Sequence, residues 1–211
     1  ALIIISGVQK GIERYTKILM PLLLLLLFIL VFRSVTLPGA GKGIGFLFKP
    51  DFSKITASTV LEALGQAFFS LSIGMGTLIT YGSYIRKDNV LGSTAFSVAL
   101  ADTFIAVLAG LAIFPAVFAF NIAPESGEGL VYITLPNIFQ QMPGGYFFSL
   151  MFFVLLGVAA LTSTISVLEV IVAFFVEELK LKRKAATWLA TSSVSILGIM
   201  CVLSTSVMSD V

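Results

Sequence analysis

The first residues whose types and spacing could do chemistry lie within an apolar stretch, over 66–77. Ser70 and Ser72 are followed there by Gly74 and Gly76. Glycine is a poor helix former and serine competes for backbone hydrogen bonds, so a helix can unwind at this point. Freed carbonyls and the two hydroxyls would suit a hard cation, and a helix restarting after Gly76 would favour an anionic ligand group. The alternative is that the glycines only permit close helix packing.

A second polar cluster lies in another apolar stretch and has four hydroxyls within five residues, 162–166. Ala159 stands three residues before Thr162, so its carbonyl and the hydroxyls of Thr162 and Ser163 converge on one helix edge. Three oxygens at one edge can flank a cation. The alternative is that the hydroxyls bond back to carbonyls one turn earlier, or join neighbouring helices.

Two carboxylates also interrupt apolar stretches, Asp102 in Leu-Ala-Asp-Thr and Glu169 one turn after the hydroxyl cluster. A charge deep in an apolar phase costs a few kcal/mol, so each should face the protein interior. We expect a functional role for Asp102. Glu169 is either functional, or protonated, or paired structurally.

Composition identifies the solvent of these elements. Of the 211 residues, 58% are hydrophobic and only 11% are charged, which indicates a membrane protein. A net charge of +2 gives no sign of a nucleic-acid partner. The chain has no His and one Cys, Cys201, so it cannot form a disulfide, a zinc site or a Cys/His or Ser/His catalytic pair by itself. An enzyme is therefore not expected, and Cys201 is interpreted as a small apolar residue.

Five stretches are long and apolar enough to cross a bilayer, which predicts an all-α, polytopic transmembrane bundle forming one membrane domain over 1–211. Residues 1–8 lack the features of a signal peptide and are interpreted as the tail of an earlier apolar segment. The predicted spans are 18–37, 58–85 (broken near 70–76), 90–120, 146–176 and 186–207.

The charges of the connecting segments predict the orientation. One side carries nine Lys and Arg, in the segments around 10–17, 86–88 and 180–184, and the other carries three, in 38–57. The positive-inside rule makes the nine-charge side cytoplasmic, so 38–57 and 121–145 face outward. Trp188 then lies at the cytoplasmic interface, where indole rings are enriched.

Four strings within these elements match a known pattern: 10–14 (KGIER), 65–76 (GQAFFSLSIGMG), 81–84 (YGSY) and 159–163 (AALTS). They resemble the neurotransmitter:sodium symporter family, especially its prokaryotic amino-acid transporters. The resemblance implies that the five spans are the fifth to ninth helices of an eleven- or twelve-helix, inverted-repeat transporter in the cell membrane. It also implies that the partners of this chain are the missing helices of the same full-length protein, lipid, sodium ions and an amino-acid substrate.

The resemblance also implies roles for individual residues. A first Na⁺ site would use Ser70 and Asp102, where relatives often have Thr and Asn, and a second would use the Ala159 carbonyl with the Thr162 and Ser163 hydroxyls. Phe69, Ser83 and Tyr84 would act as gates, and 121–145 would form an extracellular lid. The substrate pocket would be lined by Phe69, Ser70, Ser72, Gly74, Met75, Thr164 and Val167.

Two departures from the family pattern suggest details of the mechanism. Met75 replaces a larger aromatic residue of some relatives, which favours a bulkier apolar substrate. Chloride-dependent relatives have Ser where Ala106 stands here, and Asp102 brings a carboxylate to the same region. Because a carboxylate can supply the negative charge that chloride brings, we expect chloride-independent transport, with proton counter-movement through Asp102 as an open option.

The sequence therefore predicts sodium-coupled symport of a hydrophobic amino acid by alternating access. Two alternatives stay open. One is a proton- or sodium-coupled carrier of another inverted-repeat family. The other is a non-transporting membrane scaffold, in which the hydroxyls of Ser70, Thr162 and Ser163 only join helices.

Overall fold

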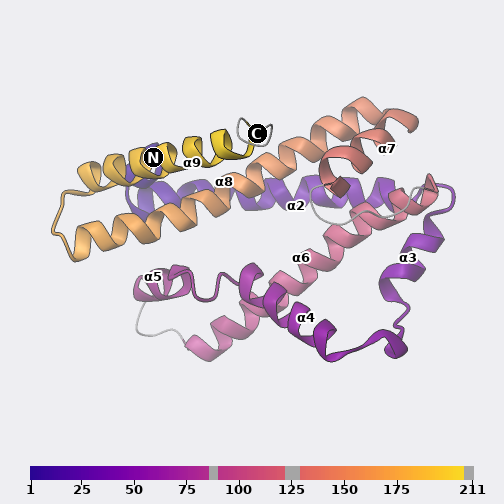
Figure 1. Cartoon of the computed structure of the whole chain (residues 1–211), viewed down its shortest axis with the longest axis horizontal. Helices are drawn as coiled ribbons and strands as arrows, with labels where there is room; N and C mark the ends of the chain where they lie inside the picture. Colours follow the sequence, from indigo (N-terminus) through magenta and orange to yellow (C-terminus); the bar gives the residue numbers. More distant parts are fainter. Residues whose placement is uncertain (86–89, 122–128, 207–211) are drawn as a thin grey trace. The chain divides into compact units, whose positions relative to one another are not determined.

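The computed structural model describes residues 1–85, 90–121 and 129–206, which form helices and no strand (Figure 1). The predicted all-α fold class is confirmed. The α-helices are α1 Leu2–Ile5, α2 Arg14–Val35, α3 Ala40–Phe48, α4 Ala57–Ser70, α5 Thr77–Ser83, α6 Leu91–Ala119, α7 Leu135–Gln141, α8 Gly145–Glu177 and α9 Arg183–Ser206. Two π-helices, η1 Val8–Glu13 and η3 Leu130–Thr134, and one 3₁₀ turn, η2 Phe52–Lys54, lie between them.

Among the described residues, four helices are long and apolar enough to cross a membrane: Gly11–Val35, Leu91–Ala119, Gly145–Glu177 and Arg183–Ser204. Most of their apolar side chains are exposed, as expected where lipid is the solvent. At 1.5 Å per residue the 33-residue α8 is about 50 Å long, so it must tilt in a bilayer or project beyond it. The chain is a multi-pass membrane protein.

The remaining predicted span, 58–85, is divided between α4 and α5. Neither helix is long enough to cross a membrane alone. The backbone between them turns through three positive φ angles, at Ser72 (54°), Gly74 (85°) and Gly76 (76°). Left-handed backbone cannot continue an α-helix, and glycine is the residue that adopts it without steric cost. The interruption is therefore local in origin.

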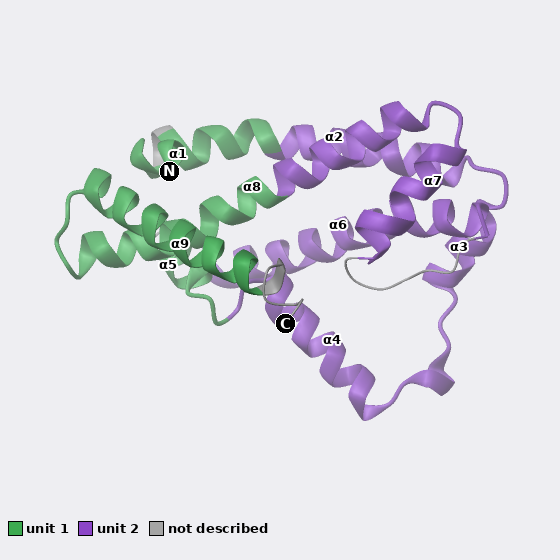
Figure 2. Ribbon diagram, turned by 45° about the horizontal axis from the view of Figure 1, so that its top comes forward, with its two compact units in different colours: residues 1–19, 74–85, 160–211 green, residues 20–73, 86–159 purple. Residues whose placement is uncertain are grey.

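The described residues divide into two compact units, coloured separately in Figure 2. Unit 1 comprises residues 1–19, 74–85 and 160–211, and its buried core consists of Ile4, Ile12, Ile165, Leu168, Val172, Ala186 and Ala190. Unit 2 comprises residues 20–73 and 86–159. Its core consists of Leu30, Leu37, Ala40, Ala116, Val117, Leu135, Ile138, Phe139, Met142, Met151 and Phe152.

Within unit 2 the segment predicted to face outward, 38–57, is largely helical. Its helix α3 packs closely on α6, and a Cβ on Gly43 would come within 2.6 Å of the Phe114 and Pro115 backbone. Only glycine fits so close an approach. Of the predicted lid 121–145, residues 129–145 contain η3 and α7, while 122–128 lie outside the described residues.

Candidate functional site

The break between α4 and α5 contains three of the predicted substrate residues, Ser72, Gly74 and Met75. The backbone amides of Leu71 and Ile73 donate to the Ala67 and Phe68 carbonyls, at 3.1 and 2.9 Å, and so close the last turn of α4. The chain then restarts at α5 after Gly76, which provides no side-chain cap. The helix is unwound at this point, as the Ser and Gly residues predicted.

The two residues predicted for the first Na⁺ site are in direct contact within unit 2. The Ser70 hydroxyl, at the end of α4, donates a hydrogen bond of 2.5 Å to Asp102 Oδ1 on α6. Hydrogen bonds to a carboxylate of this length are among the strong ones. Ser70 ends α4 where the break begins, so the pair places a hydroxyl and a carboxylate beside unwound backbone. These are oxygen ligands of the kind a hard cation takes.

The residues predicted for the second Na⁺ site, Ala159, Thr162 and Ser163, lie on one unbroken helix, α8. Two neighbouring hydroxyls bond back to carbonyls one turn earlier, which is the alternative given for this cluster. Thr164 Oγ1 donates to the Ala160 carbonyl at 2.7 Å, and Ser166 Oγ donates to the Thr162 carbonyl at 3.2 Å. The cluster thus combines helix-internal hydroxyls with Ser163, whose side chain is exposed.

A cavity of about 450 Å³ in unit 1 brings together three predicted site residues, Ser163, Thr164 and Val167. This size is within the range of small-molecule pockets. Thr191, on α9, adds a buried hydroxyl oxygen that has no hydrogen-bond partner among the described residues. Sequence reasoning missed Thr191, although the polar run 191–193 in an apolar helix was a signal. The remaining walls are Ala1, Leu168, Ile171, Val194 and Ser195.

Two predicted pocket residues keep much of their surface exposed. Phe69, at the end of α4, is 69% exposed, and Met75, in the break, is 44% exposed. Their place on the interrupted segment agrees with the prediction. Contact between them and a substrate stays a prediction.

The predicted gate residue Tyr84 belongs to a buried polar network in unit 1. Its hydroxyl donates to Glu169 Oε1 at 2.9 Å, while the Arg183 guanidinium binds Glu169 Oε2 at 2.6 Å. Glu169 is fully buried, so Arg183 supplies the countercharge that a buried carboxylate requires. Of the options predicted for Glu169, which were a functional role, protonation or a structural pair, the structure shows an ion pair, with Arg183. The other gate residue, Ser83, donates to the Thr80 carbonyl at 2.7 Å.

Arg183 has a further contact that the sequence did not reveal. Its Nε donates to the Ile4 carbonyl at 2.8 Å, so one guanidinium joins the end of α1, the buried Glu169 and the start of α9. Sequence reasoning counted Arg183 only as a loop charge. The spacing of 14 residues between Glu169 and Arg183 crosses a turn, which no helical periodicity reveals.

No group of three or more Asp, Glu, Cys or His side chains is placed to hold a metal ion in the part of the chain that the structure describes. A site built from hydroxyls, carbonyls and one carboxylate, as at Ser70 and Asp102, suits a weakly held monovalent cation better than a transition metal.

Comparisons with known proteins identify the family of this chain. The model of the sodium:neurotransmitter symporter family matches residues 1–209. The sodium-dependent transporter YhdH of Bacillus subtilis (strain 168) is 44% identical over 210 residues, which is 100% of this chain and 47% of that protein. A sodium-dependent nutrient amino acid transporter of Drosophila melanogaster is 35% identical over 193 residues, which is 85% of this chain and 30% of that protein.

Among solved structures, the crystal structure of MhsT in complex with L-phenylalanine is similar with a TM-score of 0.86 and 49% sequence identity, covering 100% of this chain and 48% of MhsT. The chain spans about half the length of YhdH and of MhsT. Family model, sequence and fold agree along almost all of its residues, and the chain belongs to the sodium:neurotransmitter symporter family.

Proposed function

We propose that the protein containing this chain carries out sodium-coupled symport of an amino acid across the cell membrane. The observation that carries the proposal is the contact of Ser70 with Asp102 beside the interrupted helix. Unwound backbone at membrane depth is tolerated where it lines a site, because lipid offers it no hydrogen-bond partner. A hydroxyl, a carboxylate and free carbonyls at such a point form an oxygen-rich cation site.

The substrate is a zwitterionic amino acid with an apolar side chain. Support comes from the cavity that Ser163, Thr164 and Val167 share, which mixes hydroxyls with branched apolar groups, and from MhsT, a relative whose structure holds L-phenylalanine. Met75 in the break is flexible and unbranched, so it adapts to bulky apolar groups. The α5 terminus after Gly76 carries a partial positive charge that favours the substrate carboxylate.

Coupling follows from shared ligands. If the substrate carboxylate is itself a ligand of the first Na⁺ ion, each of the two would raise the affinity of the other by the same factor. The second ion, at Ala159, Thr162 and Ser163, would stabilise the outward-facing state. Binding energy then shifts the population between outward- and inward-facing states, which is alternating access.

Transport is chloride-independent in this proposal. The Asp102 carboxylate is held against Ser70 at the proposed sodium site, and there it supplies the negative charge that an external anion would bring. Ala106, one helical turn further along α6, has no hydroxyl to bind an anion.

The test is uptake of labelled amino acids by proteoliposomes that contain the full-length protein, with an inward sodium gradient against a potassium control. Uptake should require sodium and be lost in Thr162→Val. Thr94→Val is the matched control, because Thr94 Oγ1 bonds only within the first turn of α6, and it should retain uptake. Sodium-independent uptake would reassign the protein to another carrier family, and no uptake of any amino acid would favour the scaffold.

A further inference from the structure

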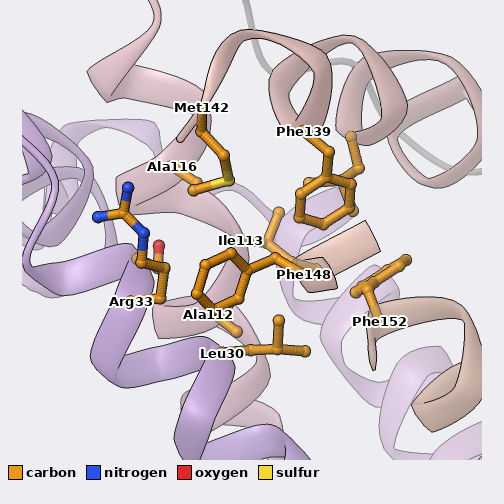
Figure 3. A pocket seen from close by; sticks show the side chains of 11 residues that line it. Leu30, Arg33, Ala112, Ile113, Ala116, Phe139, Met142, Phe148 and Phe152 are labelled. Atoms are coloured by element: carbon orange, nitrogen blue, oxygen red, sulfur yellow. The ribbon is translucent and has the colours of Figure 1, made fainter. Parts of the chain in front are cut away.

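A small cavity at one end of unit 2 is separate from the site described above and shares no residue with it. It is about 20 Å³ and is lined by parts of α2, α6, α7 and α8. Figure 3 shows the labelled side chains on several sides of Phe148, with Arg33 on one side and Phe139 and Phe152 on the other. Its walls are Leu30, Arg33, Ser34, Ala112, Ile113, Ala116, Leu135, Phe139, Met142, Phe148 and Phe152.

Two polar side chains, Arg33 and Ser34, line this cavity. Ser34 is 3% exposed, and its hydroxyl oxygen has no hydrogen-bond partner there. Arg33 makes no ion pair with any described residue, and its guanidinium carbon lies 5.6 Å from the centroid of the Phe148 ring. A buried hydroxyl without a partner costs free energy, which a small ligand or ion bound there would recover.

The chemistry of the walls selects the ligand class. A guanidinium offers only hydrogen-bond donors and the Ser34 hydroxyl offers one more, while the remaining side chains are apolar. A water molecule has two hydrogens to donate, but these side chains offer it only one acceptor, the Ser34 oxygen. An anion needs donors alone. The space of about 20 Å³ holds about one water-sized particle, so the smallest anions fit it best.

We propose that this cavity binds a single halide-sized anion, chloride under physiological conditions, between the Arg33 guanidinium and the Ser34 hydroxyl. The phenylalanine ring edges, which carry partial positive charge, complete the shell. Because the walls come from four helices, the anion joins α7, in the predicted lid, to α2 and α8. Chloride at this place stabilises one end of unit 2. It does not replace the charge of Asp102, so transport itself remains chloride-independent.

The experiment uses the full-length protein in detergent at constant sodium, with chloride replaced stepwise by gluconate, and follows thermal unfolding. The unfolding temperature should rise with chloride and saturate. In Arg33→Gln the half-saturating chloride concentration should increase about tenfold or more, as expected for loss of a charged hydrogen-bond donor. Ser34→Ala should weaken the response to a smaller extent. Lys42→Gln removes the same charge from an exposed position of α3 and should respond like the parent.

A second measurement covers the case in which Arg33→Gln fails to fold. Crystals of the parent grown in bromide should show one anomalous peak between Arg33 and Ser34, and crystals of Ser34→Ala a weaker one. A water at this position in bromide would overturn the proposal. So would a chloride response that is equal in the parent, Ser34→Ala and Arg33→Gln, or one that gluconate reproduces at equal ionic strength.

Discussion

Asp102 is the residue on which the proposed ion chemistry most depends. Its carboxylate accepts the Ser70 hydrogen bond, and in the proposed first cation site it would supply the full negative charge. Asp102→Asn keeps the shape and removes the charge. We expect the sodium concentration that half-saturates uptake to rise at least about tenfold, the effect of losing roughly 1.4 kcal/mol or more of charge-assisted binding. Titration of uptake against sodium in proteoliposomes measures this.

Asp51→Asn is the matched control for Asp102. Asp51 is an exposed carboxylate at the start of the 3₁₀ turn, and it accepts hydrogen bonds from the backbone amide and the hydroxyl of Ser53. The Ser53 side chain, and to a lesser extent the Lys54 side chain, hold the pKa of Asp51 below its usual value. It is far in sequence from the polar break, and its substitution should leave the sodium dependence unchanged. Equal sodium titrations for the parent and Asp102→Asn would remove Asp102 from the ion site.

Glu169 makes a different prediction, because its charge is fully buried and paired. Removing one partner of a buried ion pair costs about 3–5 kcal/mol, and since the Arg183 side chain is 26% exposed we expect about 2–4 kcal/mol for Glu169→Gln. Thermal or denaturant unfolding of the full-length protein measures the loss. Arg183→Met combined with Glu169→Gln should cost less than the sum of the two single changes.

The exposed pair of Lys17 and Glu13 is the control for this buried pair. Their atoms are also 2.6 Å apart, but the side chains are 74% and 50% exposed. Glu13→Gln should cost less than about 0.5 kcal/mol, because solvent screens exposed pairs. If Glu169→Gln were as mild as Glu13→Gln, the buried network would not stabilise unit 1.

At the scale of the element, the interrupted helix predicts a contrast between two glycines. Gly74 has a φ of 85° in the break, with open space where a Cβ would lie, so only the backbone angle opposes Gly74→Ala. A left-handed residue other than glycine costs about 1–2 kcal/mol, which would favour a continuous helix over 57–83 and reduce uptake. Uptake and thermal unfolding of Gly74→Ala measure both effects.

Gly65 provides the opposite case within the same predicted span. It lies inside α4, also with open space for a Cβ, so Gly65→Ala should stabilise the helix by up to about 1 kcal/mol and retain uptake. Loss of uptake in both variants would indicate close helix packing around the glycines, the alternative interpretation of this stretch. Equal uptake by Gly74→Ala and the parent would show that transport does not need the break.

The elements also show which features a sequence predicts and which it does not. Apolar length predicted the long helices, and the Ser and Gly residues of 70–76 predicted the interruption, since both depend on local composition. The π-helix Val8–Glu13 and the short α3 were not predicted, because no composition signal distinguishes them from a connector. The partnership of Glu169 with Arg183 and Tyr84 depends on tertiary contacts, which a single sequence does not contain.

At the scale of the whole molecule, the site residues belong to two compact units of a chain that spans about half the length of YhdH and of MhsT. The proposed function therefore belongs to the full-length protein, and we expect the 211-residue chain alone to show no uptake. Reconstituting this chain and the full-length protein in parallel tests the expectation. Sodium-driven uptake by the chain alone would contradict it and show that the remaining helices are dispensable.

The full-length protein should show reciprocal coupling between its two ligands. If one ion shares its shell with the substrate carboxylate, sodium must raise the affinity for L-phenylalanine by the factor by which L-phenylalanine raises the affinity for sodium. Sodium at about 100 times its dissociation constant should also stabilise the protein by about 2.7 kcal/mol. Binding of L-phenylalanine at several sodium concentrations, at constant ionic strength with potassium, measures the coupling. Equal affinity in sodium and potassium would exclude a shared ion site, whereas coupling that survives Thr162→Val but not Asp102→Asn would assign it to the ion at Ser70 and Asp102.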